Sequence, residues 1–232
     1  MKTEKLIGIL RDADLVGGAE ISVTPLTGGV SSDIRLVTTP ERSFVVKRAL
    51  DKLRVQDDWY ADVSRNDYEQ AYLRYVGKIV PEAVPSILFS DPDAGLFVME
   101  YLGNGFENWK SALLAGDVNP TYAKEAGRIL GEIHRVSWGD QSAAETFDST
   151  GNFFELRLDP YLLTTASRHP ELSTYLETES QRIQETKLCL VHGDFSPKNM
   201  LIREGRLVLL DCEVAWYGEP AFDAAFLLNH FL

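Results

Sequence analysis

A single stretch near the C-terminus, residues 190–213, carries the side chains best suited to chemistry. An apolar run leads into Asp194, and Asn199 follows five residues later. An expected β-hairpin over residues 200–210 then delivers Asp211 at its end. Two carboxylates and one amide therefore meet around one tight turn. Magnesium-assisted phosphoryl transfer uses such a set, because one carboxylate receives a hydroxyl proton while another, with an amide oxygen, holds Mg²⁺ against ATP phosphates.

An ordinary polar turn is the alternative interpretation of the same residues. Gly193-Asp194 and Ser196-Pro197 are typical of turns between core strands, where Asp and Asn bond to their own backbone. The spacing, the flanking strands and the second aspartate together favour phosphoryl transfer over this alternative.

The motif resembles the catalytic loop of the protein-kinase fold, with HGD at residues 192–194, Asn199 five positions on, and DCE at 211–213 in place of D-F-G. The sequence HGD at this position resembles the motif of the aminoglycoside phosphotransferase and choline kinase branch. Proteins of that branch phosphorylate small molecules. The resemblance implies that Asp194 is the catalytic base and that Asn199 and Asp211 bind Mg²⁺. The implied cofactors are ATP and Mg²⁺, and the implied partner is a small-molecule hydroxyl acceptor.

Composition and charge restrict the class of protein. The 232 residues are 44% hydrophobic and 25% charged, as in ordinary globular proteins, and the net charge is −12. A nucleic-acid-binding protein needs basic patches, so nucleic acid is not an expected partner. An acidic protein suits a cationic substrate, although most acidic proteins are merely soluble. Cys189 and Cys212 lie in apolar, strand-like surroundings, which indicates reduced core thiols. With no signal sequence and no membrane-length apolar run, we expect a cytoplasmic protein and no membrane partner.

The pattern of apolar and polar residues predicts strands in the first half and mostly helices in the second. The resemblance implies an α+β, bilobal protein kinase-like fold. An antiparallel five-stranded sheet with a helix would form a nucleotide-binding lobe over residues 1–100. A mostly helical catalytic lobe would follow over residues 101–232. The N-terminal elements expected from the pattern are a helix at 5–15, strands at 21–26, 34–37 and 43–49, a helix at 64–76, and strands at 86–89 and 95–99.

A glycine turn and a lysine in this half are candidates for binding ATP. In a kinase-like fold, Gly28, Gly29 and Ser31 would place backbone N–H groups over the phosphates. An ordinary hairpin turn with the same sequence is the alternative. Lys47, near the end of the third strand, would reach the α- and β-phosphates by the same resemblance. A surface lysine on an edge strand is the alternative.

The lysine needs a carboxylate partner, and the resemblance places it on the following helix. Glu69 is the expected residue, with a solvent-facing Glu69 as the alternative. Glu100 and Leu102 lie in the expected hinge, where main-chain groups would meet the adenine edge. An ordinary loop is the alternative there.

In the second half, helical spacing predicts a short helical segment from 109 to 115, a long helix from residue 120 and another from 221, with a connecting loop at 141–147. Helices over 156–176 are expected to break near Pro160 and Pro170. The resemblance implies that this insertion lines the acceptor pocket. The sequence does not choose the acceptor, so aminoglycoside-, choline- and sugar-like molecules all remain open.

Four further side chains have expected supporting roles. The resemblance implies that Asp223 braces the catalytic-loop backbone, although a carboxylate at a helix N-terminus is an equal alternative. His192 would brace the same loop by bonding to main chain. Lys198 would neutralise the transferred phosphoryl group, or else lie in solvent. Glu213 would support the metal ligands without being one of them.

The chain ends at Asn229-His230-Phe231-Leu232, inside an apolar run without a capping residue. Because the resembling family continues with further helices, we expect the catalytic lobe to be incomplete. A catalytically inactive nucleotide-binding or regulatory relative is therefore the alternative function, although retention of Asp194, Asn199 and Asp211 argues against it. A protein kinase is disfavoured, since the segment from Asp211 to Pro220 is too short for an activation loop.

Overall fold

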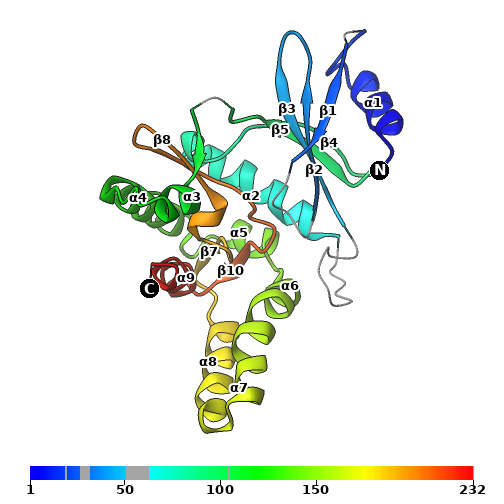
Figure 1. Cartoon of the computed structure of the whole chain (residues 1–232). Helices are drawn as coiled ribbons and strands as arrows, with labels where there is room; N and C mark the ends of the chain where they lie inside the picture. Colours follow the sequence, from blue (N-terminus) through cyan, green and yellow to red (C-terminus); the bar gives the residue numbers. More distant parts are fainter. Residues whose placement is uncertain (19, 27–31, 51–62, 104, 232) are drawn as a thin grey trace. The chain divides into compact units, whose positions relative to one another are not determined.

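The N-terminal helix α1 (Thr3–Asp12) packs against one face of an antiparallel sheet in the computed structural model (Figure 1). Leu6 and Leu10 lie one helical turn apart and are both fully buried, so they share the core with apolar side chains of the sheet. The structure describes residues 1–18, 20–26, 32–50, 63–103 and 105–231.

The sheet follows the strand order β1-β2-β3-β5-β4, with every neighbouring pair antiparallel. The five predicted strands are therefore confirmed, with the same bounds for β3 and with ends that differ by at most two residues for the others. They are β1 Ser22–Pro25, β2 Ser32–Thr38, β3 Ser43–Ala49, β4 Ile87–Asp91 and β5 Leu96–Glu100.

The central strand β3 buries both of its faces. Phe44 and Val46 enter the core shared with α1, whereas Val45 and Lys47 point to the opposite face, since side chains alternate along a strand. Lys47 is paired across the sheet with Ile34 and Phe97 and is only 2% exposed. An edge-strand surface lysine is thereby excluded.

The chain forms two compact units, described here separately. The first comprises Met1–Asn66 with Ser86–Gly103, and the second comprises Asp67–Pro85 with Asn104–Leu232. Most of helix α2 (Arg65–Ile79) groups with the second unit. A lobe boundary at residue 100 stays a prediction.

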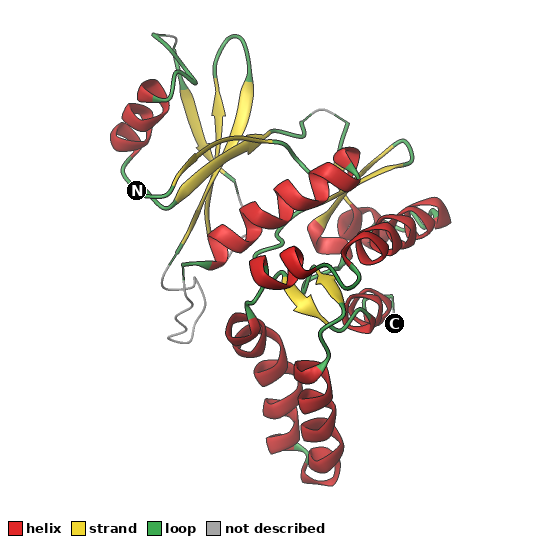
Figure 2. Ribbon diagram, turned by 180° about the vertical axis from the view of Figure 1, so that it is seen from behind, coloured by secondary structure: helices red, strands yellow, loops and turns green. Residues whose placement is uncertain are grey.

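The second unit is mostly helical, and α7 lies beside α8 in both views (Figures 1 and 2). In the described ranges, each helix is too short or too polar to pass through the hydrocarbon core of a membrane. Besides α2, the helical elements are η1 Pro81–Ala83, α3 Trp109–Leu114, α4 Pro120–Ser137, α5 Gln141–Thr146, α6 Thr150–Phe153, η2 Phe154–Leu163, α7 Thr164–Arg168, η3 Pro170–Leu172, α8 Ser173–Glu185, η4 Pro197–Asn199 and α9 Ala221–Asn229.

Two sequence-based expectations in this unit are wrong. The segment predicted as a loop at 141–147 forms α5, because the Asp140 side chain accepts the Ser142 amide proton at 2.9 Å and caps a helix too short to show periodicity. No break occurs at Pro160, because η2 is a π-helix whose wider turn accommodates the proline. The break expected near Pro170 is confirmed by the end of α7 at Arg168.

Short strands flank the residues of the motif in the second unit. The predicted hairpin is confirmed, with β8 (Met200–Arg203) antiparallel to β9 (Arg206–Leu209). Its two-residue turn, Glu204-Gly205, has φ values of 44° and 81°, as a tight hairpin requires. The remaining strands are β6 Glu107–Asn108, β7 Cys189–Val191 and β10 Trp216–Gly218.

Candidate active site

Strand β7 delivers the HGD motif through a turn that only glycine can make easily. Gly193 has φ of 77°, and a Cβ built there would lie 2.4 Å from the Val214 carbonyl oxygen. A side chain at this position would therefore be strained and would also displace a neighbouring backbone segment. The glycine fixes the direction in which Asp194 leaves the strand.

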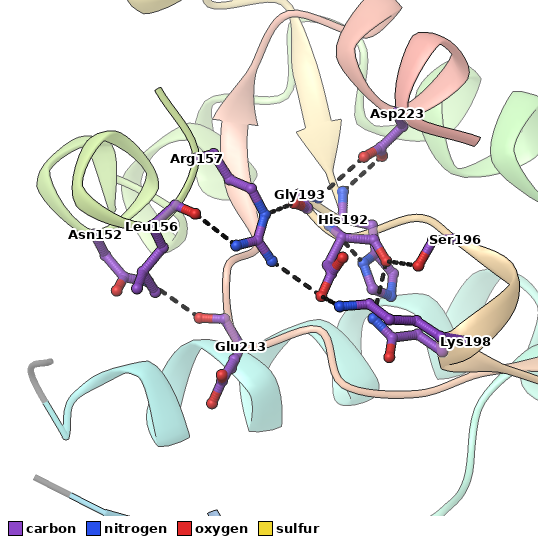
Figure 3. A network of polar contacts seen from close by, with 11 residues as sticks. Asn152, Leu156, Arg157, His192, Gly193, Ser196, Lys198, Glu213 and Asp223 are labelled. Carbon is purple, nitrogen blue, oxygen red and sulfur yellow. Dashed lines mark hydrogen bonds and ion pairs between the residues drawn. The ribbon is translucent and has the colours of Figure 1, made fainter. Parts of the chain in front are cut away.

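Asp223 holds this turn from the first turn of α9. Its Oδ2 accepts the His192 amide proton at 2.7 Å and its Oδ1 accepts the Gly193 amide proton at 3.0 Å (Figure 3). Asp223 is fully buried, so these bonds satisfy two backbone donors that water does not reach. The predicted bracing role of Asp223 is confirmed by this geometry.

His192 supports the same turn with its ring. Nδ1 accepts the Asp194 amide proton at 3.2 Å, so the ring bonds to the main chain of the same loop. The pKa of His192 is lowered, because burial outweighs the nearby charges of Asp223, Asp194 and Asp211, which raise it. A neutral ring is the form that can accept this bond.

The Asp194 carboxylate is buried and has unequal oxygens. Oδ2 lies 3.0 Å from Arg157 Nη2 and 3.0 Å from Lys198 Nζ, as drawn in Figure 3. Oδ1 has no hydrogen-bond partner within the described ranges. A buried carboxylate oxygen ordinarily accepts a bond, so Oδ1 is suited to a donor from a bound molecule.

Asn199 lies between the aspartate turn and the hairpin. Its side-chain Nδ2 donates to the backbone carbonyl of Asp194 at 3.0 Å. The backbone carbonyl of Asn199 accepts the Leu210 amide proton at 2.9 Å. Asn108 steadies the intervening turn, because its Nδ2 donates to the Lys198 carbonyl at 2.7 Å. The structure thus ties the backbones of Asn199 and the residue before Asp211 together.

Three carboxylates lie close together, two from the segment after β9 and one from α2. Asp211 has φ of 59°, an uncommon conformation for a residue other than glycine and one that often accompanies function. Oxygens of Glu69, Asp211 and Glu213 all lie within 4.8 Å of one another. Oxygen donors of this kind suit a hard cation such as Mg²⁺. Glu69 is 2% exposed, so the solvent-facing alternative for it is excluded.

The residues expected to hold ATP fall mainly in the first unit. Lys47 is buried in β3, Glu100 ends β5 with its carboxylate accepting the Ser86 amide proton at 3.3 Å, and Leu102 is half-buried. Their roles, and the pairing of Lys47 with Glu69 of the second unit, stay predictions. The glycine-turn candidates lie outside the described residues: Gly28, Gly29 and Ser31.

The sequence reasoning missed Arg157, Ser149 and Asn152. Ser149 donates to the Ala215 carbonyl at 2.6 Å and Asn152 donates to the Glu213 carbonyl at 3.1 Å, so both fasten the segment after Asp211. In the sequence Arg157 stands between Glu155 and Asp159, so no local pattern marks it as a site residue.

The geometry agrees with a comparison of the whole chain against models of protein families. The model described as the phosphotransferase enzyme family matches residues 22–232. The chain belongs to this family. The recognition of a phosphotransferase from the HGD motif is thereby confirmed.

Curated members of this phosphotransferase family include small-molecule kinases. The methylthioribose kinase of Pectobacterium atrosepticum is 24% identical over 214 residues, which cover 81% of this chain and 53% of that enzyme. The chain therefore spans about half the length of the curated relatives it matches.

Solved structures confirm the protein kinase-like, α+β fold of this chain. A choline/ethanolamine kinase family protein from Mesorhizobium loti superimposes with a TM-score of 0.66 at 17% identity, covering 99% of this chain and 71% of that one. A spectinomycin phosphotransferase in complex with ADP and spectinomycin gives 0.62 at 15% identity, covering 97% and 73%.

Proposed function

We propose that this chain transfers the γ-phosphate of ATP to a hydroxyl group of a small molecule and requires Mg²⁺. One observation carries the proposal. The buried Asp194 carboxylate is held by two cations on Oδ2, while Oδ1 has no partner within the described ranges. A substrate hydroxyl would supply the missing donor.

Asp194 would act as the general base or as the group that orients the acceptor. As the acceptor oxygen bonds to the γ-phosphorus and the bond to the β-phosphate oxygen breaks, the hydroxyl proton would pass to Oδ1 and ADP would leave. The nearby Lys198 ammonium would face the charge that spreads over the transferred group. Because phosphoryl transfer needs little covalent help, positioning and charge neutralisation supply most of the rate enhancement.

Asn199 and Asp211 would hold the metal ion, with Glu213 in support. The neighbouring carboxylates of Glu69, Asp211 and Glu213 provide the hard oxygen donors that this ion prefers. A bound Mg²⁺ would neutralise phosphate charge. Lys47, Glu69, Gly28, Gly29 and Ser31 would steady the phosphates, and the backbones of Glu100 and Leu102 would meet the adenine.

The acceptor class follows from the names of the relatives. Methylthioribose, choline or ethanolamine, and aminoglycosides each offer a hydroxyl group on a small polar molecule. We infer an acceptor of this size and polarity.

Isothermal calorimetry of ATP, with and without Mg²⁺, tests the proposal directly. We expect binding that depends on Mg²⁺, and Asp211→Asn should weaken it by about 10-fold or more, as loss of one charged ligand implies. Asp194→Asn should bind Mg-ATP like the parent chain but form no ADP when methylthioribose or choline is added.

The matched control is Asp93→Asn, which changes an exposed aspartate in the turn between β4 and β5. It should alter neither binding nor turnover. If the folded chain binds no Mg-ATP, or if Asp194→Asn retains full turnover, the proposed function is wrong.

A further inference from the structure

Arg157 reaches the candidate base from an element far from the motif in sequence. It lies on the π-helix η2 and is 11% exposed. Its guanidinium uses three separate nitrogens: Nη2 lies 3.0 Å from Asp194 Oδ2, Nε donates to the Gly193 carbonyl at 2.5 Å, and Nη1 donates to the Leu156 carbonyl at 2.7 Å (Figure 3).

We propose that Arg157 is a positioning residue that sets the orientation of the Asp194 carboxylate for phosphoryl transfer. The inference rests on the proposed function, since it assigns Arg157 to the same reaction. No motif of the family in this sequence contains Arg157, and no chemical step is assigned to its own atoms.

The two contacts on the motif act together. Nε donates to the backbone carbonyl of Gly193, and Nη2 contacts the side chain of Asp194. The planar guanidinium therefore fixes the Asp194 carboxylate relative to its own main chain. A planar guanidinium with several directed donors can do this, whereas an ammonium is a single point charge. Lys198 also contacts Oδ2 but is 45% exposed, so it holds the carboxylate less rigidly.

As a consequence, the two oxygens of the Asp194 carboxylate have different roles. Both cations bind Oδ2, which leaves Oδ1 as the oxygen without a partner in the described residues. Loss of Arg157 would let the carboxylate rotate, and either oxygen could then turn toward Lys198. The acceptor hydroxyl would no longer meet a correctly placed oxygen.

The local helix is built to present this arginine. Pro160 lies inside η2 and has no N–H, so it disfavours regular α-helical hydrogen bonding in this segment. Arg157 Nη1 donates to the Leu156 carbonyl, which anchors the guanidinium on its own helix. π-Helical turns are rare and occur frequently at functional sites, which agrees with this assignment.

The test compares Arg157→Ala and Arg157→Lys with the parent chain in ADP formation from Mg-ATP, using methylthioribose and choline as acceptors. For Arg157→Ala we expect kcat to fall about 100-fold, the effect of displacing a reacting group by ~1 Å. The KM for Mg-ATP should change by less than about threefold, because the ATP site is untouched. Arg157→Lys should recover only part of the rate, since charge returns without the directed donors.

Guanidinium chloride at millimolar concentration, far below denaturing levels, should restore turnover to Arg157→Ala, whereas methylammonium should not. The matched control is Arg128→Ala, which breaks surface ion pairs with Glu125 and Glu82 and should leave kcat unchanged. An Arg157→Ala kcat within about threefold of the parent value, or an Arg157→Lys kcat equal to it, would overturn the inference.

A structural readout separates this inference from the proposed function. In NMR spectra, Arg157→Lys should shift the amide signals of Gly193 and Asp194, and Arg128→Ala should not. If the parent chain forms no ADP while these signals shift, the proposed function fails and the contact stands without a reaction. If the parent chain is active and neither kcat nor the signals respond, the positioning role of Arg157 is wrong.

Discussion

Two buried aspartates of the second unit illustrate how environment assigns a role at the scale of single residues. Both oxygens of Asp223 accept backbone amide protons, so this carboxylate is fully occupied in holding the turn. Asp194 has cations on one oxygen and no partner in the described residues on the other. The first arrangement is structural, and the second is suited to proton transfer.

Asp223→Ala should therefore destabilise the chain. It leaves the buried amides of His192 and Gly193 without acceptors, at a cost of about 1–3 kcal/mol for each group. We expect the free energy of unfolding in urea to fall by about 2–5 kcal/mol, with a lower kcat because the turn that carries Asp194 loosens.

The control for this change is Asp117→Ala at an exposed position after α3. Its effect should stay within about 0.5 kcal/mol. Equal stability of the two variants would show that the turn does not depend on Asp223.

At the scale of secondary structure, η2 is the element whose form we predicted wrongly from the sequence. Pro160 predicted a break, yet the helix continues by widening to π-helical hydrogen bonding. Arg157 is anchored on this helix through the Leu156 carbonyl, so the π-helical segment supports the approach of the guanidinium to Asp194.

Pro160→Ala should separate stability from activity. Alanine supplies an N–H and is about 3 kcal/mol more favourable than proline inside a helix, so the free energy of unfolding should rise by about 1–3 kcal/mol. The new amide would also favour regular α-helical bonding, in which residue 160 donates to the Leu156 carbonyl that Arg157 uses, so we expect kcat to fall. Urea unfolding and ADP formation measure the two effects.

Pro170→Ala provides the matched control, because Pro170 begins η3, where a missing N–H costs nothing. It should change neither quantity appreciably. A Pro160→Ala variant with raised stability and unchanged kcat would mean that the proline does not serve the arginine contact.

At the scale of the whole molecule, the residues expected to bind ATP come from both compact units. Lys47 is buried in the sheet of the first unit, and Glu69 is buried on α2 in the second. Their pairing stays a prediction, which mutagenesis can test.

A double-mutant cycle on Mg-ATP affinity tests this pairing. Lys47→Ala and Glu69→Ala should each weaken binding, and the double variant should lose less than the sum, with a coupling energy of about 1–3 kcal/mol. Pairing Lys47→Ala with Asp93→Asn, at an exposed site, should give additive effects. Additive losses for Lys47 and Glu69 would exclude a direct pair.

The sequence by itself determined the kinase-like class, the five-stranded sheet, the hairpin and the motif residues Asp194, Asn199 and Asp211. These features depend on local patterns: alternation along strands, tight-turn glycines and fixed spacing within a few residues. A periodic strand such as β3 records its two faces in its own sequence, which is why the burial of Phe44 and Val46 was predictable.

Only the tertiary structure decided that α5 is a helix, that η2 passes through Pro160, and that Arg157 meets Asp194. A capping bond, a π-helical turn and an ion pair across 37 positions of sequence leave no periodic trace. Partners of this kind are chosen by packing, since a buried carboxylate must find its donors wherever the fold brings them.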